Sequence, residues 1–246
     1  ILGHASRYGH TPMGARLGFG LGLARCWPRT VLPVSWVVML TRSAGLWLVI
    51  VFIVAAGTRV GWTVARHGSN PDCLSYPDED AYRLAGRSLA AGAGLVDEFG
   101  YRATYMPAYP AFIAIFEYLH LPMMALWLAQ AVLAALVAPA TFLLARRWTQ
   151  LPWPGQDAAQ ASLGVPVFAG LAAAVDPFLV FFSSLLLTEA LFAPMLVAIW
   201  WLVLMVIDHR RPLPLANAIV LGLGLTGCIM LRPSCTILVA IVPVLV

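Results

Sequence analysis

A run of acidic residues, Asp78-Glu79-Asp80, is the part of this sequence best suited to acid–base chemistry. A carboxylate at Asp78 can accept a proton from an acceptor hydroxyl and so act as a general base. The run also has the composition of a helix start, because Asp78 suits an N-cap and acids favour the positive end of the helix dipole. Glu79 and Arg83 have the i, i+4 spacing of an ordinary ion pair. Two interpretations therefore stand, a catalytic site and a plain helix N-terminus.

Three further charged residues lie in apolar surroundings, where charge is costly and a functional role is the default hypothesis. Arg59 and Arg232 come near the predicted outer ends of apolar helices and are suited to stabilising a departing phosphate, although snorkelling to the interface is the simpler explanation of each. Glu189 follows Thr188 at the start of another apolar helix, where it suits substrate contact, capping or pairing with an arginine. Three histidines at predicted membrane edges are interpreted as plain interface residues: His67, His120 and His209.

The composition predicts that these residues are positioned by a membrane protein. Of the residues, 61% are hydrophobic and 11% are charged, against about 25% charged in a typical soluble domain. Apolar stretches long enough to cross a bilayer recur, and helices satisfy their own backbone hydrogen bonds there. The basic residues are all arginine, which fits GC-rich codon usage better than nucleic-acid binding. The cysteines are too scattered for a metal site or a disulfide framework.

The charge pattern predicts an all-α polytopic protein with about five to six spans. Residues 1–43 hold five arginines and no acid, which places this Arg-rich segment in the cytoplasm or at its interface. Residues 66–120 hold seven of the eleven acidic residues and form a long external first loop carrying amphipathic surface helices. Asp176-Pro177 is expected at an external turn. The spans are expected at about 44–64, 121–145, 161–175, 185–207 and 215–231, with an incomplete sixth at 234–246.

Several short motifs, none specific alone, occur in an order that resembles a known family. They are Pro77-Asp78-Glu79 with Tyr82, Ala85 and Gly92; Tyr109-Pro110; Leu143-Leu144-Ala145-Arg146-Arg147; Leu187-Thr188-Glu189-Ala190-Leu191-Phe192; and Leu231-Arg232-Pro233. Their order and topology resemble the GT-C membrane glycosyltransferases, in the branch of the dolichyl-phosphate-mannose protein mannosyltransferases and the aminoarabinose transferase of lipid A. The resemblance covers about 44–246, a GT-C-like domain that is expected to be incomplete at its C-terminus.

The resemblance implies an inverting transfer of a sugar from a polyprenyl-phosphate donor to a hydroxyl of an extracytoplasmic protein, lipid or glycan. It implies Asp78 as the base and Glu79 as its neighbour in the site. An active site outside the cytoplasm has no nucleotide-sugar pool, and the chain has no Rossmann-like nucleotide domain, so a lipid-borne donor is also expected on physical grounds. The expected substrate-binding residues are Arg59, Tyr82, Tyr109, Glu189 and Arg232.

The expected setting is a multi-pass protein of the plasma or inner membrane, with its site facing the extracytoplasmic side. Its partners are the lipid-linked donor, the acceptor and membrane lipids, with no nucleic acid; no metal ligand set is predicted, and a divalent cation is left open as a cofactor. Two other functions compete with the transferase. One is a transporter or flippase of lipid-linked substrates, which predicts repeats and broken helices at mid-membrane. The other is a non-catalytic scaffold or truncated remnant.

Overall fold

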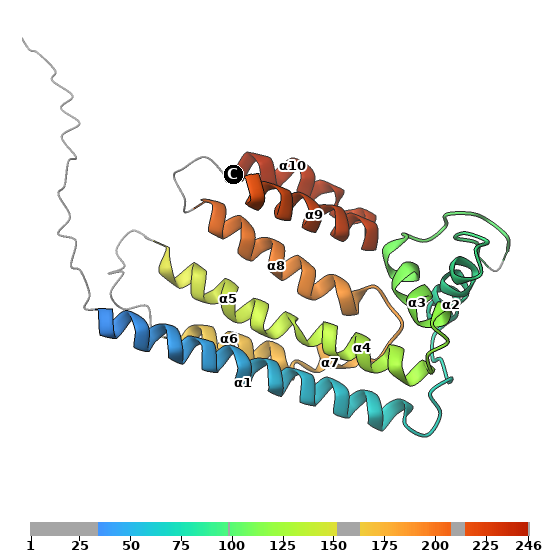
Figure 1. The fold of residues 1–246 in the computed structure, drawn as a ribbon, viewed down its shortest axis with the longest axis horizontal. Helices are drawn as coiled ribbons and strands as arrows, with labels where there is room; N and C mark the ends of the chain where they lie inside the picture. The colour runs from blue at the N-terminus through green and yellow to red at the C-terminus, as the bar shows by residue number, and fades with distance from the viewer. Residues whose placement is uncertain (1–33, 98, 152–162, 208–214, 246) are drawn as a thin grey trace, which may run out of the picture.

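The computed structural model describes residues 34–97, 99–151, 163–207 and 215–245 (Figure 1). Within these ranges the chain is helical and forms no strand, apart from one isolated bridge between Val96 and Arg102. The all-α expectation is confirmed. The predicted Arg-rich segment lies outside the described residues up to position 33, as do the connection at 152–162 and His209.

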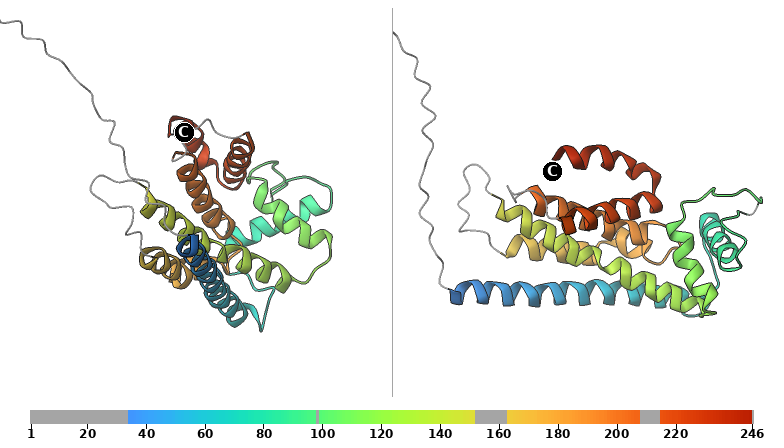
Figure 2. Two further views of the ribbon diagram at one scale, coloured as in Figure 1. Left: turned by 60° about the vertical axis from the view of Figure 1, so that its left-hand side comes forward. Right: turned by 45° about the horizontal axis from the view of Figure 1, so that its top comes forward.

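Long helices run side by side and make up most of the molecule (Figures 1 and 2). Two stretches are long and apolar enough to cross a membrane, Ser43–His67 and Met123–Gln150, and only 22% and 39% of their most apolar windows are buried. A core helix of a soluble protein would be mostly buried, so these exposed apolar surfaces are typical of membrane association. The helices of this bundle are α1 (Val34–His67), α4 (Met123–Ala135), α5 (Val137–Gln150), α6 (Gly164–Val175), α7 (Pro177–Phe182), α8 (Glu189–Ile207), α9 (Leu215–Leu231) and α10 (Thr236–Leu245).

The largest departure from the expected topology concerns Asp176-Pro177, which interrupts a helix without reversing the chain. Helix α6 ends at Val175, and α7 continues in the same general direction (Figure 1). Asp176 caps α7 by accepting a hydrogen bond from the Leu179 amide at 2.8 Å. The chain turns back at residues 183–188, immediately before α8. The predicted external turn at Asp176-Pro177 is therefore wrong, because a Pro at the first position of a helix can begin a new segment as well as end an old one.

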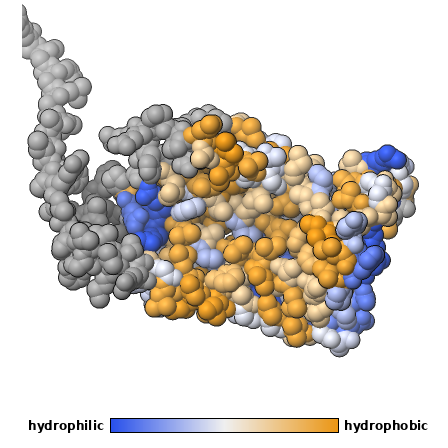
Figure 3. All heavy atoms as spheres, viewed as in Figure 1, coloured by the Kyte–Doolittle hydropathy of each residue, from blue (hydrophilic) through white to orange (hydrophobic). Residues whose placement is uncertain are grey.

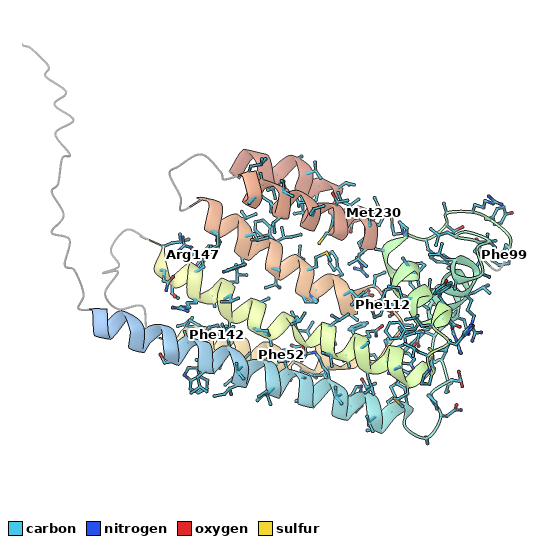
Figure 4. The ribbon with its side chains drawn as sticks, in the orientation of Figure 1. Phe52, Phe99, Phe112, Phe142, Arg147 and Met230 are labelled. Carbon is cyan, nitrogen blue, oxygen red and sulfur yellow. The ribbon has the colours of Figure 1, made fainter. Side chains whose placement is uncertain are left out.

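Two further helices, α2 (Pro77–Ala90) and α3 (Ala108–Tyr118), cover one end of the bundle (Figure 2). They pack closely at Gly86, where an added Cβ would lie 2.6 Å from the Ile113 Cγ2 atom. We call this end the loop end; it comprises His67, α2, α3, residues 183–188 and Arg232, the last following α9. The surface along the helices is mostly apolar, whereas hydrophilic residues gather at the loop end and at the opposite end (Figure 3). Phe99 marks the loop end and Arg147 the opposite end (Figure 4).

Candidate functional site

Asp78 lies in the first turn of α2 but is not its N-cap. The cap is Tyr76, and Pro77 takes the first helical position, where its missing N–H costs nothing. Glu79 completes the helix start, because its Oε1 accepts hydrogen bonds from the Ser75 and Tyr76 amides at 3.1 and 3.2 Å. The predicted cap at Asp78 is therefore corrected to a cap at Tyr76 supported by Glu79. Asp78 is left exposed, with a carboxylate that the helix start does not need.

Glu79 is fully buried and does not pair with Arg83. Its second oxygen, Oε2, accepts a hydrogen bond from the Leu186 amide at 3.1 Å, which ties α2 to the turn before α8. Arg83 instead contacts the carboxylate of Asp72 at 2.7 Å. The ion pair predicted from the i, i+4 spacing is thus wrong, since three backbone amides compete for the Glu79 carboxylate and a buried amide left unpaired is costly.

Glu189 and Arg232, two of the predicted substrate-binding residues, form an ion pair. The Arg232 Nε donates to the Thr188 hydroxyl at 3.2 Å, and the guanidinium carbon lies 5.4 Å from the centre of the Phe192 ring. These contacts hold the arginine against the N-terminus of α8 while leaving 39% of its side chain exposed. The pairing anticipated as one explanation of Glu189 is present, and it brings together residues that are 43 positions apart.

Tyr82 joins α2 to this ion pair. Its hydroxyl interacts with the Thr188 side chain, and its pKa is raised by burial and then by the negative charges of Glu189 and Asp78. The phenol therefore stays protonated and neutral at physiological pH. We call Asp78, Tyr82, Thr188, Glu189 and Arg232 the charged cluster. It combines two carboxylates, two hydroxyls and an arginine from three separate parts of the chain.

Tyr109 lies behind the charged cluster. It is fully buried and meets the Tyr82 ring edge to face, with 5.2 Å between ring centres. Burial, and then the charge of Glu79, raise its pKa well above the ordinary value for tyrosine. Its hydroxyl donates to the Gln130 side-chain oxygen. Tyr109 therefore packs against the buried side of Tyr82 and has no contact with solvent.

Arg59 is also fully buried, and its guanidinium binds backbone rather than facing solvent. It donates to the carbonyls of Ala173 and Ala174, each at 3.0 Å, and to Ala55 at 3.2 Å. The Ala173 and Ala174 carbonyls end α6, where Pro177 has no N–H to offer. The snorkelling explanation is thus wrong. Arg59 lines a cavity of about 250 Å³ together with Glu189 and Arg232. Two of its N–H groups bind the end of α6, and its Nε is buried without a partner.

A second, larger cavity runs along the apolar side of α8. It has a volume of about 700 Å³ and is lined almost entirely by apolar residues of α4, α5, α8 and α9, among them Leu143, Met195 and Trp201. Pro194 borders both cavities. Leu231, the neighbour of Arg232, also lines the larger one. We call this larger cavity the apolar groove; it ends beside the charged cluster.

Sequence reasoning missed two polar residues that the structure places next to the site. Gln130 is fully buried in α4 and donates from Nε2 to the Ser183 and Leu185 carbonyls at 3.0 and 2.6 Å. His67, predicted as a plain interface residue, is instead buried, stacked on Trp127 with 4.0 Å between ring centres, and hydrogen-bonded to the Ser184 carbonyl at 2.9 Å. The signal for Gln130 was available, because an amide inside an apolar span is costly unless it has partners.

Across the described ranges there is no group of three or more His, Cys, Asp or Glu side chains that could hold a metal ion. The charged cluster itself supplies carboxylates, hydroxyl groups and an arginine. Comparison of the chain with known protein families, with curated proteins and with solved structures finds no match, so the function has to be argued from this site.

Proposed function

We propose that this protein is a multi-pass membrane glycosyltransferase that moves a sugar from a polyprenyl-phosphate donor to a hydroxyl acceptor on the extracytoplasmic side. The observation that carries the proposal is that Tyr82 lies within electrostatic range of both the exposed Asp78 carboxylate and Arg232, while Leu231, the neighbour of Arg232, lines the apolar groove. Such a site has to accommodate a charged group and a hydrocarbon chain at once. A lipid that carries a phosphate and a sugar has both parts.

The apolar groove fits the hydrocarbon part of the donor. Its lining is apolar, and burying apolar surface is favourable by about 25 cal/mol per Å². Arg232, directly after Leu231, then lies where a phosphate at the head of such a chain would come. Arginine binds phosphate through several parallel N–H donors, so this residue is the best candidate for holding the leaving group.

Asp78 supplies the base. In the proposed reaction, the acceptor hydroxyl gives its proton to the Asp78 carboxylate while its oxygen forms a bond to the anomeric carbon. The bond from that carbon to the phosphate oxygen breaks, and the electron pair leaves with the polyprenyl phosphate, which Arg232 stabilises. Attack opposite the leaving group inverts the anomeric centre. Tyr82, neutral and next to Asp78, is suited to hydrogen-bonding the sugar.

The distribution of charge favours an orientation with the loop end outside. Exposed acids of α2 and the preceding loop, including Asp72, Asp78 and Asp80, lie at the loop end. Arg146 and Arg147 lie near the other end of the bundle, at the end of α5. Basic residues that flank membrane helices are retained in the cytoplasm. The proposed location is accordingly the plasma or inner membrane.

The break between α6 and α7 is the feature that favours a transporter, since broken helices in transporters expose carbonyls for ions. Here the freed carbonyls of Ala173 and Ala174 already accept hydrogen bonds from Arg59, and Thr58 adds a bond to Ala174 at 3.0 Å. Carbonyls that already accept these hydrogen bonds are poor ligands for a transported ion. The transferase is therefore the better-supported proposal, and the scaffold remains the outcome expected if no transfer is found.

The test is sugar transfer by the full-length protein in membranes, with a panel of radiolabelled polyprenyl-phosphate hexoses and pentoses. Asp78→Asn removes the base but keeps the shape, so we expect transfer to fall by at least about 100-fold. Asp80→Asn is the matched control, because Asp80 is an exposed acid of the same helix turn, and it should transfer like the unaltered protein. Equal transfer by Asp78→Asn and the unaltered protein would remove Asp78 from the mechanism.

A further inference from the structure

The turn at residues 183–188 connects α7 to α8 without regular helix, so only part of its backbone is satisfied by other backbone groups. The carbonyls of Ser183 and Ser184 and the amide of Leu186 bind side chains instead. Most of these residues are buried in the protein, and a buried backbone group without a hydrogen-bond partner is costly, so it has to find one in the protein. Here the partners come from three different helices. Gln130 of α4 binds two carbonyls of the turn, Glu79 of α2 binds one amide, and His67 of α1 binds one carbonyl.

Gln130 is the centre of this arrangement. Both N–H groups of its amide are used by the turn, at Ser183 and Leu185, and its oxygen accepts from the Tyr109 hydroxyl. The two carbonyls require the NH₂ group on their side, so the orientation of the amide is fixed by chemistry. Three hydrogen bonds and complete burial fix the position of the Gln130 side chain, and this fixed side chain in turn holds the backbone that it binds.

The turn that is fixed in this way leads directly into the charged cluster. Leu186, whose amide binds Glu79, is two residues before Thr188 and three before Glu189. Thr188 accepts from Arg232, and Glu189 pairs with it. Any shift of the turn therefore moves the groups that orient Arg232. A displacement of about 1 Å at such groups can cost a catalyst about 100-fold in rate.

We infer that Gln130 and Glu79 are positioning residues, which hold the turn at residues 183–188 so that Thr188 and Glu189 fix Arg232 toward the donor phosphate. This inference rests on the proposed function for its catalytic part, but the positioning itself can be measured without any transfer. It also gives Glu79 a role different from that of Asp78. Glu79 acts through the backbone, whereas Asp78 meets the acceptor.

The first experiment measures hydrogen exchange of the full-length protein in lipid nanodiscs. Gln130→Met keeps the size and removes the donors, so the amides of residues 184–189 should exchange at least about tenfold faster. Exchange in Ser43–His67 should stay unchanged. Thr141→Val is the matched control, since Thr141 lies in the same apolar span and bonds only to the Val137 carbonyl of its own helix, at 2.8 Å. Unchanged exchange in the turn would overturn the inference, whatever the activity.

The second experiment asks whether the loosened turn matters for transfer. Gln130→Met should lower transfer about tenfold or more, and its effect should be much smaller in a Glu189→Gln background, because both changes release Arg232. Fully additive effects would overturn the positioning role, and so would faster exchange with unaltered transfer. If the unaltered protein transfers no sugar, the proposed function fails and the exchange result alone decides the inference.

A milder variant covers the case in which Gln130→Met does not fold. Tyr109→Phe removes only the hydroxyl that orients the Gln130 amide. It should raise exchange in the same residues by a smaller factor, about threefold, and leave α1 unchanged. No change in the turn with Tyr109→Phe, in a protein whose Gln130→Met form is unfolded, would also overturn the inference.

Discussion

Replacement of Arg59 by leucine is expected to destabilise the bundle strongly, although Arg59 lies inside an apolar helix where leucine is the commoner residue. The guanidinium holds the end of α6 to α1 through the carbonyls of Ala173 and Ala174. Leucine fills the space but donates no hydrogen bond. Ala174 would keep its bond from Thr58, whereas Ala173 would lose its side-chain donor, and Pro177 has no N–H to replace it.

The magnitude follows from these contacts. A buried carbonyl left without a donor costs about 1–3 kcal/mol, and hydrogen bonds from a charged group contribute about 1.5–3 kcal/mol each. Removing the buried guanidinium also removes its own desolvation cost, which offsets part of this sum. We therefore expect Arg59→Leu to lower the free energy of unfolding by about 2–4 kcal/mol.

Unfolding of the purified protein in mixed micelles by increasing SDS, followed by circular dichroism, measures this change. Arg87→Gln is the control, because its side chain is 52% exposed and its pair with Glu117 is a surface contact worth about 1 kcal/mol or less. If Arg59→Leu were as stable as Arg87→Gln, the hydrogen bonds to the end of α6 would not contribute as argued. A gain in stability would mean that the desolvation of the arginine outweighs its bonds.

Three further changes test separate parts of the molecule. Gly86→Ala forces a methyl group against Ile113 and should lower the free energy of unfolding by about 1–3 kcal/mol, whereas Gly61→Ala, with nothing within 4 Å, should not. Burial and nearby carboxylates raise the pKa of Tyr82 in the folded protein above the ordinary value of 10.0. The contribution of Tyr82 to the free energy of unfolding is therefore complete below pH 10.0 and is lost as the pH rises through the pKa of the folded state. The unaltered protein should therefore lose more stability than Tyr82→Phe between about pH 9 and about pH 11, and equal losses in an unfolding assay would contradict the shift. Cys73 is exposed in the segment between α1 and α2, next to the loop end. A membrane-impermeant maleimide should therefore label it on intact cells and should not label Cys73→Ser; label that appears only after lysis would reverse the proposed orientation.

The helices could be predicted because hydrophobic runs determine them. The predicted span at 215–231 coincides with α9, and the predicted start at Leu121 falls two residues before α4. Helix α1 begins earlier than expected, at Val34, because Arg42 does not interrupt a helix as a proline would. The helix break at Asp176 was predicted, but it was wrongly taken as the point where the chain reverses. A sequence shows where a helix breaks. The direction of the next segment depends on which side chains bind the carbonyls freed at the break, and here the donor is Arg59 of α1.

The candidate site was predictable in its residue types but not in its contacts. Glu189 and Arg232 were each singled out as charges in apolar surroundings, and the structure pairs them. Their meeting depends on how α8 and α9 pack, which no local pattern encodes. For the same reason the spacing of Glu79 and Arg83 indicated the wrong partner. Two backbone N–H groups outside the helix bind that carboxylate: the amide of Tyr76, at the N-cap, and the amide of Leu186, which is distant in the sequence.

Of the two arginines suited to a phosphate, only Arg232 keeps donors that a ligand can reach. An arginine has five N–H groups. Arg59 uses three hydrogen bonds on backbone carbonyls and has no exposed surface. Arg232 uses Nε for Thr188 and one Nη for Glu189, so its remaining N–H groups can bind an oxyanion without breaking the ion pair. Because Glu189 neutralises its charge while the site is empty, a bound phosphate gains more from the geometry of these donors than from net attraction. A lysine at position 232 would keep the charge but lose that geometry.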